Sequence, residues 1–202
     1  MPRTPLRPPA ANQVRIIGGI WRRRLLRFPP AADLRPTPDR VRETLFNWLG
    51  QELPGFATLD LFAGSGALSF EALSRGATLA VAVDAGLPAV AGLRDNAGVL
   101  GATGLEIHHS DALAFLRRES RGFDLIFLDP PFSEEWMPRL LPLISRRMNP
   151  GGWLYVEQGH ALEAAEGWEM FRQQRAGQVH YHLLRKAAGN VADEDIQRES
   201  TS

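Results

Sequence analysis

Four consecutive residues, Asp129-Pro130-Pro131-Phe132, carry groups suited to an amino group on a base ring. Proline has no backbone N–H, so this loop would present the Asp129 carboxylate and the Pro130 carbonyl as acceptors without competing donors. Two acceptors that draw the amine protons aside would turn the delocalised lone pair toward an electrophilic methyl group. Phe132 would stack on a base turned out of its helix or loop. We expect these four residues to be catalytic; a rigid turn with an incidental aromatic is the plain alternative.

A second motif is the glycine turn Gly64-Ser65-Gly66, which follows an apolar run and precedes a helical stretch. The two glycines allow a tight turn and close approach of a ligand to the helix N-terminus. A nucleotide-like cofactor would lie across such a turn at the carboxyl ends of parallel strands. The turn lacks the third glycine of a dinucleotide fingerprint and the Gly-Lys-Ser/Thr of a phosphate loop, which argues against NAD and ATP. Alone it is weak, because a tight strand–helix junction has the same pattern.

Acidic residues stand at the carboxyl ends of four successive predicted strands: Asp60, Asp84, Asp111 and Asp129. Ionised carboxylates only accept hydrogen bonds, so these acids could contact a cofactor amino group, ribose hydroxyls and an adenine amine in turn. Each acid by itself is more simply a helix N-cap or a solvated loop residue. Four acids at the same end of successive strands together favour a cofactor site. The predicted cofactor-binding residues are Asp60, Phe62, Ala63, Gly64, Ser65, Gly66, Asp84, Asp111 and Ala112.

The elements that must position these residues alternate short apolar runs with helical stretches after Pro54-Gly55, as in a parallel sheet with crossover helices. Predicted strands are 57–62, 79–83, 105–108, 125–128 and 153–156, and predicted helices are 67–75, 87–100, 112–118 and 135–148. Segments 169–174 and 178–185 predict an antiparallel hairpin at the sheet edge. The pattern therefore predicts an α/β fold.

Upstream of this domain, apolar and polar residues alternate over residues 14–28, on both sides of Gly18-Gly19. This pattern predicts two short strands joined by a turn. From Pro38 onward, apolar residues at helical spacing predict an amphipathic helix with Thr37 as its N-cap. We expect a disordered basic arm (1–12), an RNA-binding extension (13–50), a catalytic domain (51–186) and a disordered acidic tail (187–202).

The zero net charge hides an uneven distribution, because residues 1–42 hold ten arginines against two acids. The chain has 22 arginines and one lysine, which codon preference would explain, but codon preference does not gather cations at one end. A basic end favours a polyanionic partner such as RNA. The predicted RNA-binding residues, each of which is alternatively a solvated surface charge, are Arg22, Arg23, Arg24, Arg35, Arg40 and Arg42.

The composition excludes several kinds of site. The chain has no cysteine, which excludes disulfides, thiolate nucleophiles and Cys-based metal sites. His108 and His109 have no third ligand at plausible spacing, so we expect no metal. Without a long apolar run or a secretory segment, we expect a cytoplasmic protein with no membrane partner. The absence of a long exposed apolar stripe makes a monomer the expectation.

Several segments are similar to the bacterial 16S rRNA guanine-N2 methyltransferases of the RsmD type, a family of class I S-adenosylmethionine-dependent enzymes. The resemblance runs from about residue 14 to 185, and its most specific part is segment 35–49, which other methyltransferases lack. The segments are 35–49 (RPTPDRVRETLFNWL), 60–68 (DLFAGSGAL), 71–75 (EALSR), 129–132 (DPPF), 155–157 (YVE) and 176–178 (AGQ).

The resemblance implies a seven-stranded, mostly parallel Rossmann-like sheet, S-adenosylmethionine as cofactor, and methylation of N2 of the guanine usually numbered 966. The partner would be 16S rRNA in the small ribosomal subunit or its assembly intermediate. By position, Gly64 and Gly66 would line the methionine part of the cofactor, Asp111 would contact adenine, and residues 129–132 would hold the guanine.

The chain departs from the family at two places. Ala82 stands where an acid that grips the ribose often sits, so Asp84 would substitute or the ribose would be held differently. The basic hairpin, residues 18–24, lacks the usual glycine near Arg23.

The mechanism we expect is direct transfer of the methyl group from sulfonium to guanine N2, without a covalent enzyme intermediate. Asp129 would either remove an amine proton or only orient the amine. One alternative is methylation of another amine, such as a DNA adenine or a protein glutamine, and the basic amino-terminal region argues against the protein substrate. The other is a catalytically silent RNA-binding module, against which the intact glycine turn and Asp-Pro-Pro-Phe loop argue.

Overall fold

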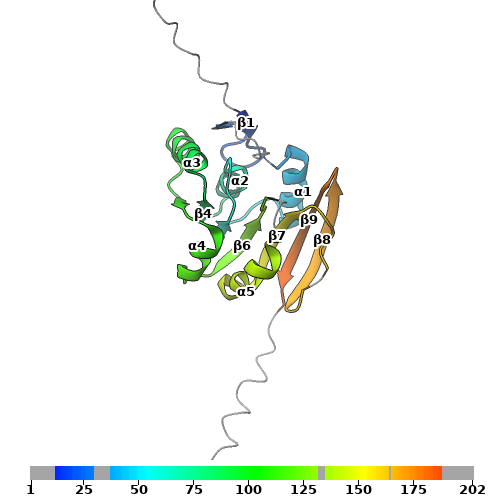
Figure 1. The fold of residues 1–202 in the computed structure, drawn as a ribbon. Helices are drawn as coiled ribbons and strands as arrows, with labels where there is room; N and C mark the ends of the chain where they lie inside the picture. The colour runs from blue at the N-terminus through cyan, green and yellow to red at the C-terminus, as the bar shows by residue number, and fades with distance from the viewer. Residues whose placement is uncertain (1–11, 30–36, 132–134, 164, 188–202) are drawn as a thin grey trace, which may run out of the picture.

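The computed structural model describes residues 12–29, 37–131, 135–163 and 165–187. A seven-stranded sheet in the order β5-β4-β3-β6-β7-β9-β8 forms its centre (Figure 1). The strands are β3 (Ala57–Asp60), β4 (Leu79–Asp84), β5 (Leu105–His109), β6 (Phe123–Leu128), β7 (Met148–Gln158), β8 (Trp168–Ala176) and β9 (Val179–Lys186). Neighbouring strands among β3, β4, β5, β6 and β7 pair in parallel. Strand β9 pairs antiparallel with both β7 and β8.

Helices cover both faces of this sheet. They are α1 (Asp39–Leu49), α2 (Ala67–Ser74), α3 (Leu87–Leu100), α4 (Ala112–Arg118) and α5 (Met137–Arg147). On one face, Ile126 and Leu154 pack with Leu116 of α4 and Ile144 of α5. On the other, Phe127 and Tyr155 belong to a cluster that contains side chains of α1 and α2. The alternation of side chains along each strand therefore divides the core into two layers.

The predicted α/β architecture, with a mostly parallel seven-stranded sheet and a final antiparallel hairpin, is confirmed. Helices predicted at 87–100 and 112–118 have the predicted bounds. The strand predicted at 153–156 is wrong in length, because β7 begins at Met148 and includes Gly151 and Gly152. The strand predicted at 57–62 ends at Asp60, and the helix predicted at 135–148 is shorter at both ends.

A small antiparallel sheet, β1 (Asn12–Arg15) and β2 (Leu25–Phe28), forms the predicted amino-terminal hairpin. Val14 and Leu26 pack in one cluster with Phe70 of α2 and Leu93 of α3. Asn12, expected in the basic arm, is the first residue of β1. Most of the predicted arm and tail, residues 1–11 and 188–202, lies outside the described residues.

The loop of this hairpin closes on the carboxyl end of α2. Ile20 N–H donates to the Ser74 carbonyl (2.8 Å), and Trp21 N–H donates to the Ser74 hydroxyl (2.9 Å). Gly19 has φ +71, and a Cβ there would overlap the Ser74 backbone, so only glycine fits this approach. Arg23 has φ 70, a left-handed conformation that glycine adopts more easily. The part of the hairpin in which the sequence lacks the usual glycine therefore contains a residue with a glycine-like backbone.

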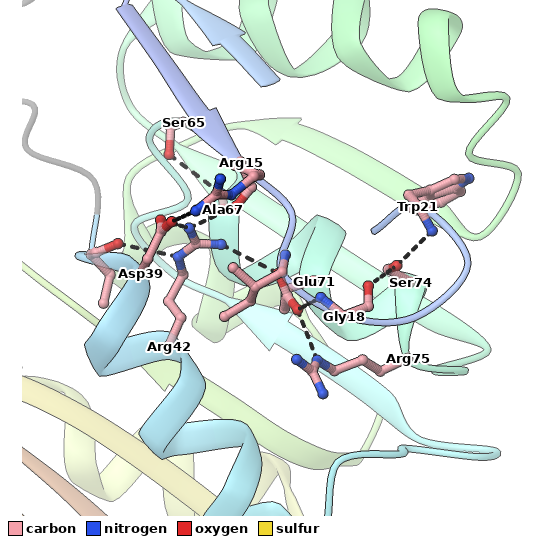
Figure 2. A network of polar contacts seen from close by, with 12 residues as sticks. Arg15, Gly18, Trp21, Asp39, Arg42, Ser65, Ala67, Glu71, Ser74 and Arg75 are labelled. Carbon is pink, nitrogen blue, oxygen red and sulfur yellow. Dashed lines mark hydrogen bonds and ion pairs between the residues drawn. The ribbon is translucent and has the colours of Figure 1, made fainter. Parts of the chain in front are cut away.

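A buried carboxylate, Glu71 of α2, holds the loop from inside (Figure 2). Its Oε1 accepts from Gly18 N–H (2.7 Å) and from Arg75 Nε (2.8 Å). Its Oε2 accepts from Ile17 N–H (2.9 Å) and from Arg42 Nη1 (3.3 Å). The four donors fill the hydrogen-bonding capacity of the carboxylate, which is why a charge is tolerated in the core.

Arg42 of α1 completes this network and is fully buried, with 0% of its surface exposed. Besides Glu71, its guanidinium donates to the Asp39 carboxylate (2.6 Å) and to the backbone carbonyls of Arg15 (2.8 Å) and Thr37 (3.2 Å). The prediction that Arg42 binds RNA is therefore wrong. Its side chain points into the core and links α1 to α2 and β1.

The predicted N-cap of α1 is also wrong. Pro38 is the N-cap residue, and no side chain caps this helix end. The Thr37 hydroxyl instead donates to Asp129 Oδ2 (3.3 Å), while the Thr37 carbonyl accepts from Arg42. The tertiary contact with the strand end outcompetes the local cap, so Thr37 joins the extension to the loop after β6.

Substitution Glu71→Ala should destabilise the protein by about 3–5 kcal/mol, because it removes the fully buried carboxylate that pairs with the buried Arg42. Urea denaturation followed by tryptophan fluorescence measures this change. Glu43→Ala, which removes an exposed carboxylate of α1, is the matched control and should change the free energy of unfolding by less than about 0.5 kcal/mol. Equal effects of the two substitutions would contradict the role given to Glu71.

Candidate active site

The carboxyl ends of β3 and β6 form the switch point of the sheet. From β3 the chain moves through α2 to β4 on one side, whereas β6 lies on the other side of β3. Connections that leave neighbouring strands toward opposite faces open a crevice at the strand ends, where α/β proteins bind their ligands. The glycine turn follows β3 and the Asp129 loop follows β6, so the fold brings the two predicted motifs to this crevice.

The glycine turn has the backbone that its sequence predicts. Gly64 and Gly66 have φ 51 and 79, and Gly66 is the N-cap of α2. A Cβ on Gly66 would collide with Leu93 and Phe70. The turn therefore lies tightly between β3 and α2 and leaves the start of α2 at the crevice.

Asp84, the last residue of β4, fixes the glycine turn from the neighbouring strand. Its Oδ2 accepts from Gly64 N–H (2.8 Å) and its Oδ1 from Gly86 N–H (2.7 Å). Each carboxylate oxygen has a second lone pair, so Asp84 retains acceptor capacity for a ligand hydroxyl. Ala82 is buried in the apolar cluster under the amino-terminal hairpin. Asp84 is thus the acid that this strand offers to the crevice.

Asp111 is a helix N-cap, which is the simpler of the interpretations given for this acid. It is the N-cap of α4, and its Oδ1 accepts from Ala114 N–H (3.0 Å). Its side chain is exposed, whereas Ala112 is buried. Phe62, on the segment between β3 and the glycine turn, meets Trp136 edge-on at 5.1 Å between ring centroids. That contact joins the glycine turn to the segment after the Asp129 loop.

Three carboxyl groups gather at adjacent strand ends: Asp60 on β3, Asp129 after β6 and Glu157 on β7. Leu128 pairs with Val156, so Asp129 and Glu157 follow in register on neighbouring strands. Asp60 accepts from the Ser69 hydroxyl (2.8 Å), and Glu157 Oε1 accepts from the buried Tyr155 hydroxyl (2.8 Å). Pro130 is buried and Pro131 is exposed, while Phe132 lies outside the described residues.

Burial raises the pKa of all three acids, and the charges of neighbouring acids raise it further for Asp60 and Asp129. Burial is the main cause that raises the pKa of Asp60 to about 7, and the charge of Asp84 adds to it. Burial raises the pKa of Asp129 well above its usual range, with further contributions from Glu157 and Asp60. Burial also raises the pKa of Glu157. The crevice therefore carries less negative charge near neutral pH than its three carboxyl groups suggest.

Two residues of this cluster were not predicted as site residues. The sequence pattern predicts Thr37 as a helix cap, and Glu157 lies in one of the segments that resemble the family. The signal for Glu157 was present, because it continues the series of acids at successive strand ends by one more parallel strand. No local signal marks Thr37, whose contact with Asp129 spans 92 residues of sequence.

A cavity of about 260 Å³ lies beside the Asp129 loop. Pro130 and Pro131 line one side, and Trp136, Gln158 and His160 are among the other lining residues. The cavity combines apolar walls with a few polar side chains, as small-molecule sites do. It can accept a planar ring next to the acceptors of the loop.

The predicted RNA-binding arginines are not at this site. Arg22, Arg23 and Arg24 are exposed on the hairpin loop at the carboxyl end of α2, whereas the glycine turn is at its amino end. The eight residues of α2 separate the two ends by about 12 Å. Arg40 is exposed on α1, and Arg35 lies outside the described residues. Any contact of the loop arginines with RNA would thus be remote from Asp129.

No helix among the described residues is long and apolar enough to span a membrane. Within the same residues, no group of three or more His, Asp or Glu side chains is placed to hold a metal ion.

The sheet order, the glycine turn at its switch point and the acid-proline loop beside it define a class I methyltransferase. Comparison with known proteins agrees. A family model described as "Conserved hypothetical protein 95" matches residues 14–185. Ribosomal RNA small subunit methyltransferase D of Escherichia coli is 38% identical over 194 residues, which cover 92% of this chain and 96% of that protein. The Haemophilus influenzae protein of the same name is 36% identical and is covered to 95%, with 87% of this chain. The chain belongs to this family of ribosomal RNA small subunit methyltransferase D proteins.

Solved structures agree with this assignment. The putative methyltransferase yhhF of E. coli superposes with a TM-score of 0.80 at 38% identity, covering 88% of this chain and all of that one. The Thermus thermophilus 16S rRNA N2 G1207 methyltransferase (RsmC) in complex with AdoMet and guanosine shares the fold. Its TM-score is 0.70 at 22% identity, with 88% of this chain and 50% of that chain covered.

Substitution Asp60→Asn should stabilise the protein at pH 8 by about 2 kcal/mol and have little effect at pH 4. The pKa of Asp60 is raised in the folded state, so its contribution to stability is present below about pH 4 and is lost as the pH rises toward 7. Asparagine does not titrate and avoids this loss. Urea denaturation from pH 4 to 8 measures the difference, with the exposed Asp95→Asn as control. A benefit that grows toward acid pH would contradict the assignment.

Proposed function

We propose that the protein uses S-adenosylmethionine to methylate the exocyclic N2 amine of one guanine in 16S rRNA, during maturation of the small ribosomal subunit. One observation carries the proposal: the glycine turn and the Asp129-Pro130-Pro131 loop lie at the carboxyl ends of neighbouring strands, on the two sides of the switch point. This arrangement would place a methyl donor on the β3–β4 side beside the amine that receives the methyl group on the β6 side.

The residues on the β3–β4 side fit S-adenosylmethionine. Asp84 has acceptor capacity for the ribose hydroxyls, and the start of α2 suits the carboxylate of the methionine part. Asp60 and Asp111 are acceptors for the ammonium and the adenine amine, respectively. When bound, the cofactor supplies a methyl group activated by a sulfonium.

The residues on the β6 side fit an aryl amine. The Asp129 carboxyl group and the Pro130 carbonyl offer two acceptors, one for each amine hydrogen, and proline leaves no backbone N–H to compete with them. The neighbouring cavity would hold the ring that carries the amine. These groups would orient the nitrogen lone pair toward the methyl group, and the methylated nitrogen would then release a proton to water.

The relatives' names supply the choice of RNA. Proteins 36–38% identical to this chain are called ribosomal RNA small subunit methyltransferases, which supports an rRNA substrate. The exposed arginines of the hairpin loop suit a phosphate backbone. The family resemblance of segments 35–49 and 129–132 supports the guanine numbered 966 as the target.

Substitution Asp129→Ala should reduce methyl transfer at least 100-fold, because it removes one of the two acceptors for the amine. The assay measures label transferred from S-adenosylmethionine to small-subunit particles from cells that lack this protein, and mass spectrometry identifies the nucleotide. Calorimetry should show cofactor affinity within threefold of wild type. Wild-type labelling of an adenine, of DNA or of protein would contradict the rRNA guanine assignment and indicate another amino-group methyltransferase.

Replacing Arg22, Arg23 and Arg24 together by Gln should weaken RNA binding and leave kcat within about twofold, because these arginines are remote from Asp129. If all three contact phosphates, the slope of log Kd against log salt should fall by about 2–3. The control replaces three exposed arginines elsewhere, Arg117, Arg146 and Arg172. An equal loss of slope in the control would show nonspecific attraction in place of a defined surface.

A further inference from the structure

The Thr37 hydroxyl lies near two carboxyl groups, that of the half-buried Asp129 and that of the buried Glu157. It donates to Asp129 Oδ2 at 3.3 Å, and it lowers the pKa of the Glu157 carboxyl group, which burial raises. Asp129 and Glu157 come from adjacent strands in register, so a side chain placed above their ends can meet both. Arg42 fixes Thr37 in this place through the Thr37 carbonyl.

A hydroxyl has one hydrogen and cannot donate to two acceptors at once. With both carboxylates ionised, one of them would face the lone pairs of the Thr37 oxygen. A single added proton completes the chain of donors: a protonated Asp129 donates to Thr37, and Thr37 donates to Glu157.

The two carboxyl groups are not equivalent in this chain. Glu157 accepts from the Tyr155 hydroxyl (2.8 Å), and the hydroxyls of Tyr155 and Thr37 both lower its pKa, because nearby donors favour the charged form. Within the described part of the chain, Asp129 has Thr37 as its hydrogen-bond partner and lies close to Asp60. The charge is therefore better placed on Glu157 and the proton on Asp129.

We propose that Asp129, Thr37 and Glu157 share one proton, so that Asp129 meets the target amine as a neutral acceptor and Glu157 carries the charge. This proposal rests on the proposed function. It makes Asp129 the catalytic residue, and Thr37 and Glu157 positioning residues that act through it. It also implies that Asp129 does not serve as the base, since its proton is already in place.

Other groups that face this unit are Asp60 on β3, Tyr155 on β7, and Tyr181 on β9 beside Tyr155. Arg42 approaches from α1, but its charge is matched by Glu71 and Asp39. Burial and the neighbouring acids raise the pKa of Asp129, which agrees with a proton that remains at neutral pH.

The test compares kcat/KM from pH 5.5 to 9.5 on small-subunit particles. Asp129→Asn keeps a neutral acceptor and can donate to Thr37, so it should retain at least a tenth of wild-type kcat, whereas Asp129→Ala loses at least 100-fold. Glu157→Gln removes the charge that keeps the proton on Asp129. Its activity should therefore decline at a pH at least one unit lower than that of wild type.

The matched control is Glu166→Gln, an exposed residue outside this cluster, whose pH profile should equal that of wild type. Titration of the guanine itself affects every variant alike and cancels in the comparison. Thr37→Val should lower kcat about tenfold and Thr37→Ser should restore it, which separates the hydroxyl from packing. Cofactor affinity and thermal melting check that each variant folds.

The proposal is overturned if Asp129→Asn is as inactive as Asp129→Ala, or if the Glu157→Gln profile superimposes on that of wild type. If wild type itself labels no RNA, the proposed function fails instead. In that case, ¹³C NMR of labelled aspartate carboxyl carbons measures the protonation of Asp129 directly. A resonance that titrates above pH 7 and is lost in Asp129→Asn supports the shared proton, and its absence refutes it.

Discussion

The buried ion pair between Arg42 and Glu71 is the interaction on which the rest of the structure depends. Glu71 holds the hairpin loop through two backbone N–H groups, and Arg42 holds the chain before α1 through the Thr37 carbonyl. A pair of charges without solvent is costly unless every donor and acceptor is used, and here backbone groups and Asp39 complete the set. The same pair thus fixes an exposed arginine loop on one side and a residue that touches Asp129 on the other.

The second constraint is the crowding of acids at the strand ends. A parallel sheet places the carboxyl ends of its strands along one edge, so Asp60, Asp129 and Glu157 are neighbours although they are far apart in sequence. Burial penalises three adjacent charges, and the structure responds with hydroxyl donors from Ser69, Tyr155 and Thr37 and with raised pKa values. The geometry that gathers a ligand site therefore also tunes its protonation.

Local pattern predicted the parts of the molecule that local physics decides. Glycines in the left-handed region, the N-cap at Asp111 and the bounds of α3 and α4 follow from spacing and residue type. The errors are contacts between distant segments. Thr37 looks like a cap and Arg42 like a surface cation until α1 is packed against α2 and β6, because helical periodicity does not show which polar residue the core will satisfy. Glu157 needed the sheet order, which places β7 next to β6.

Charge distribution joins these observations. An RNA-modifying enzyme must bring a polyanion to a crevice lined with carboxyl groups, and unscreened repulsion between like charges in a dry site amounts to several kcal/mol. The chain separates the two tasks in space: exposed arginines lie at the carboxyl end of α2, and the acids lie beyond its amino end. A proton shared between Asp129 and Glu157 would lower the remaining repulsion where the target nucleotide enters. Under the proposed function, the arginines that would attract RNA and the near-neutral acceptor that would meet its base are both positioned by one buried network.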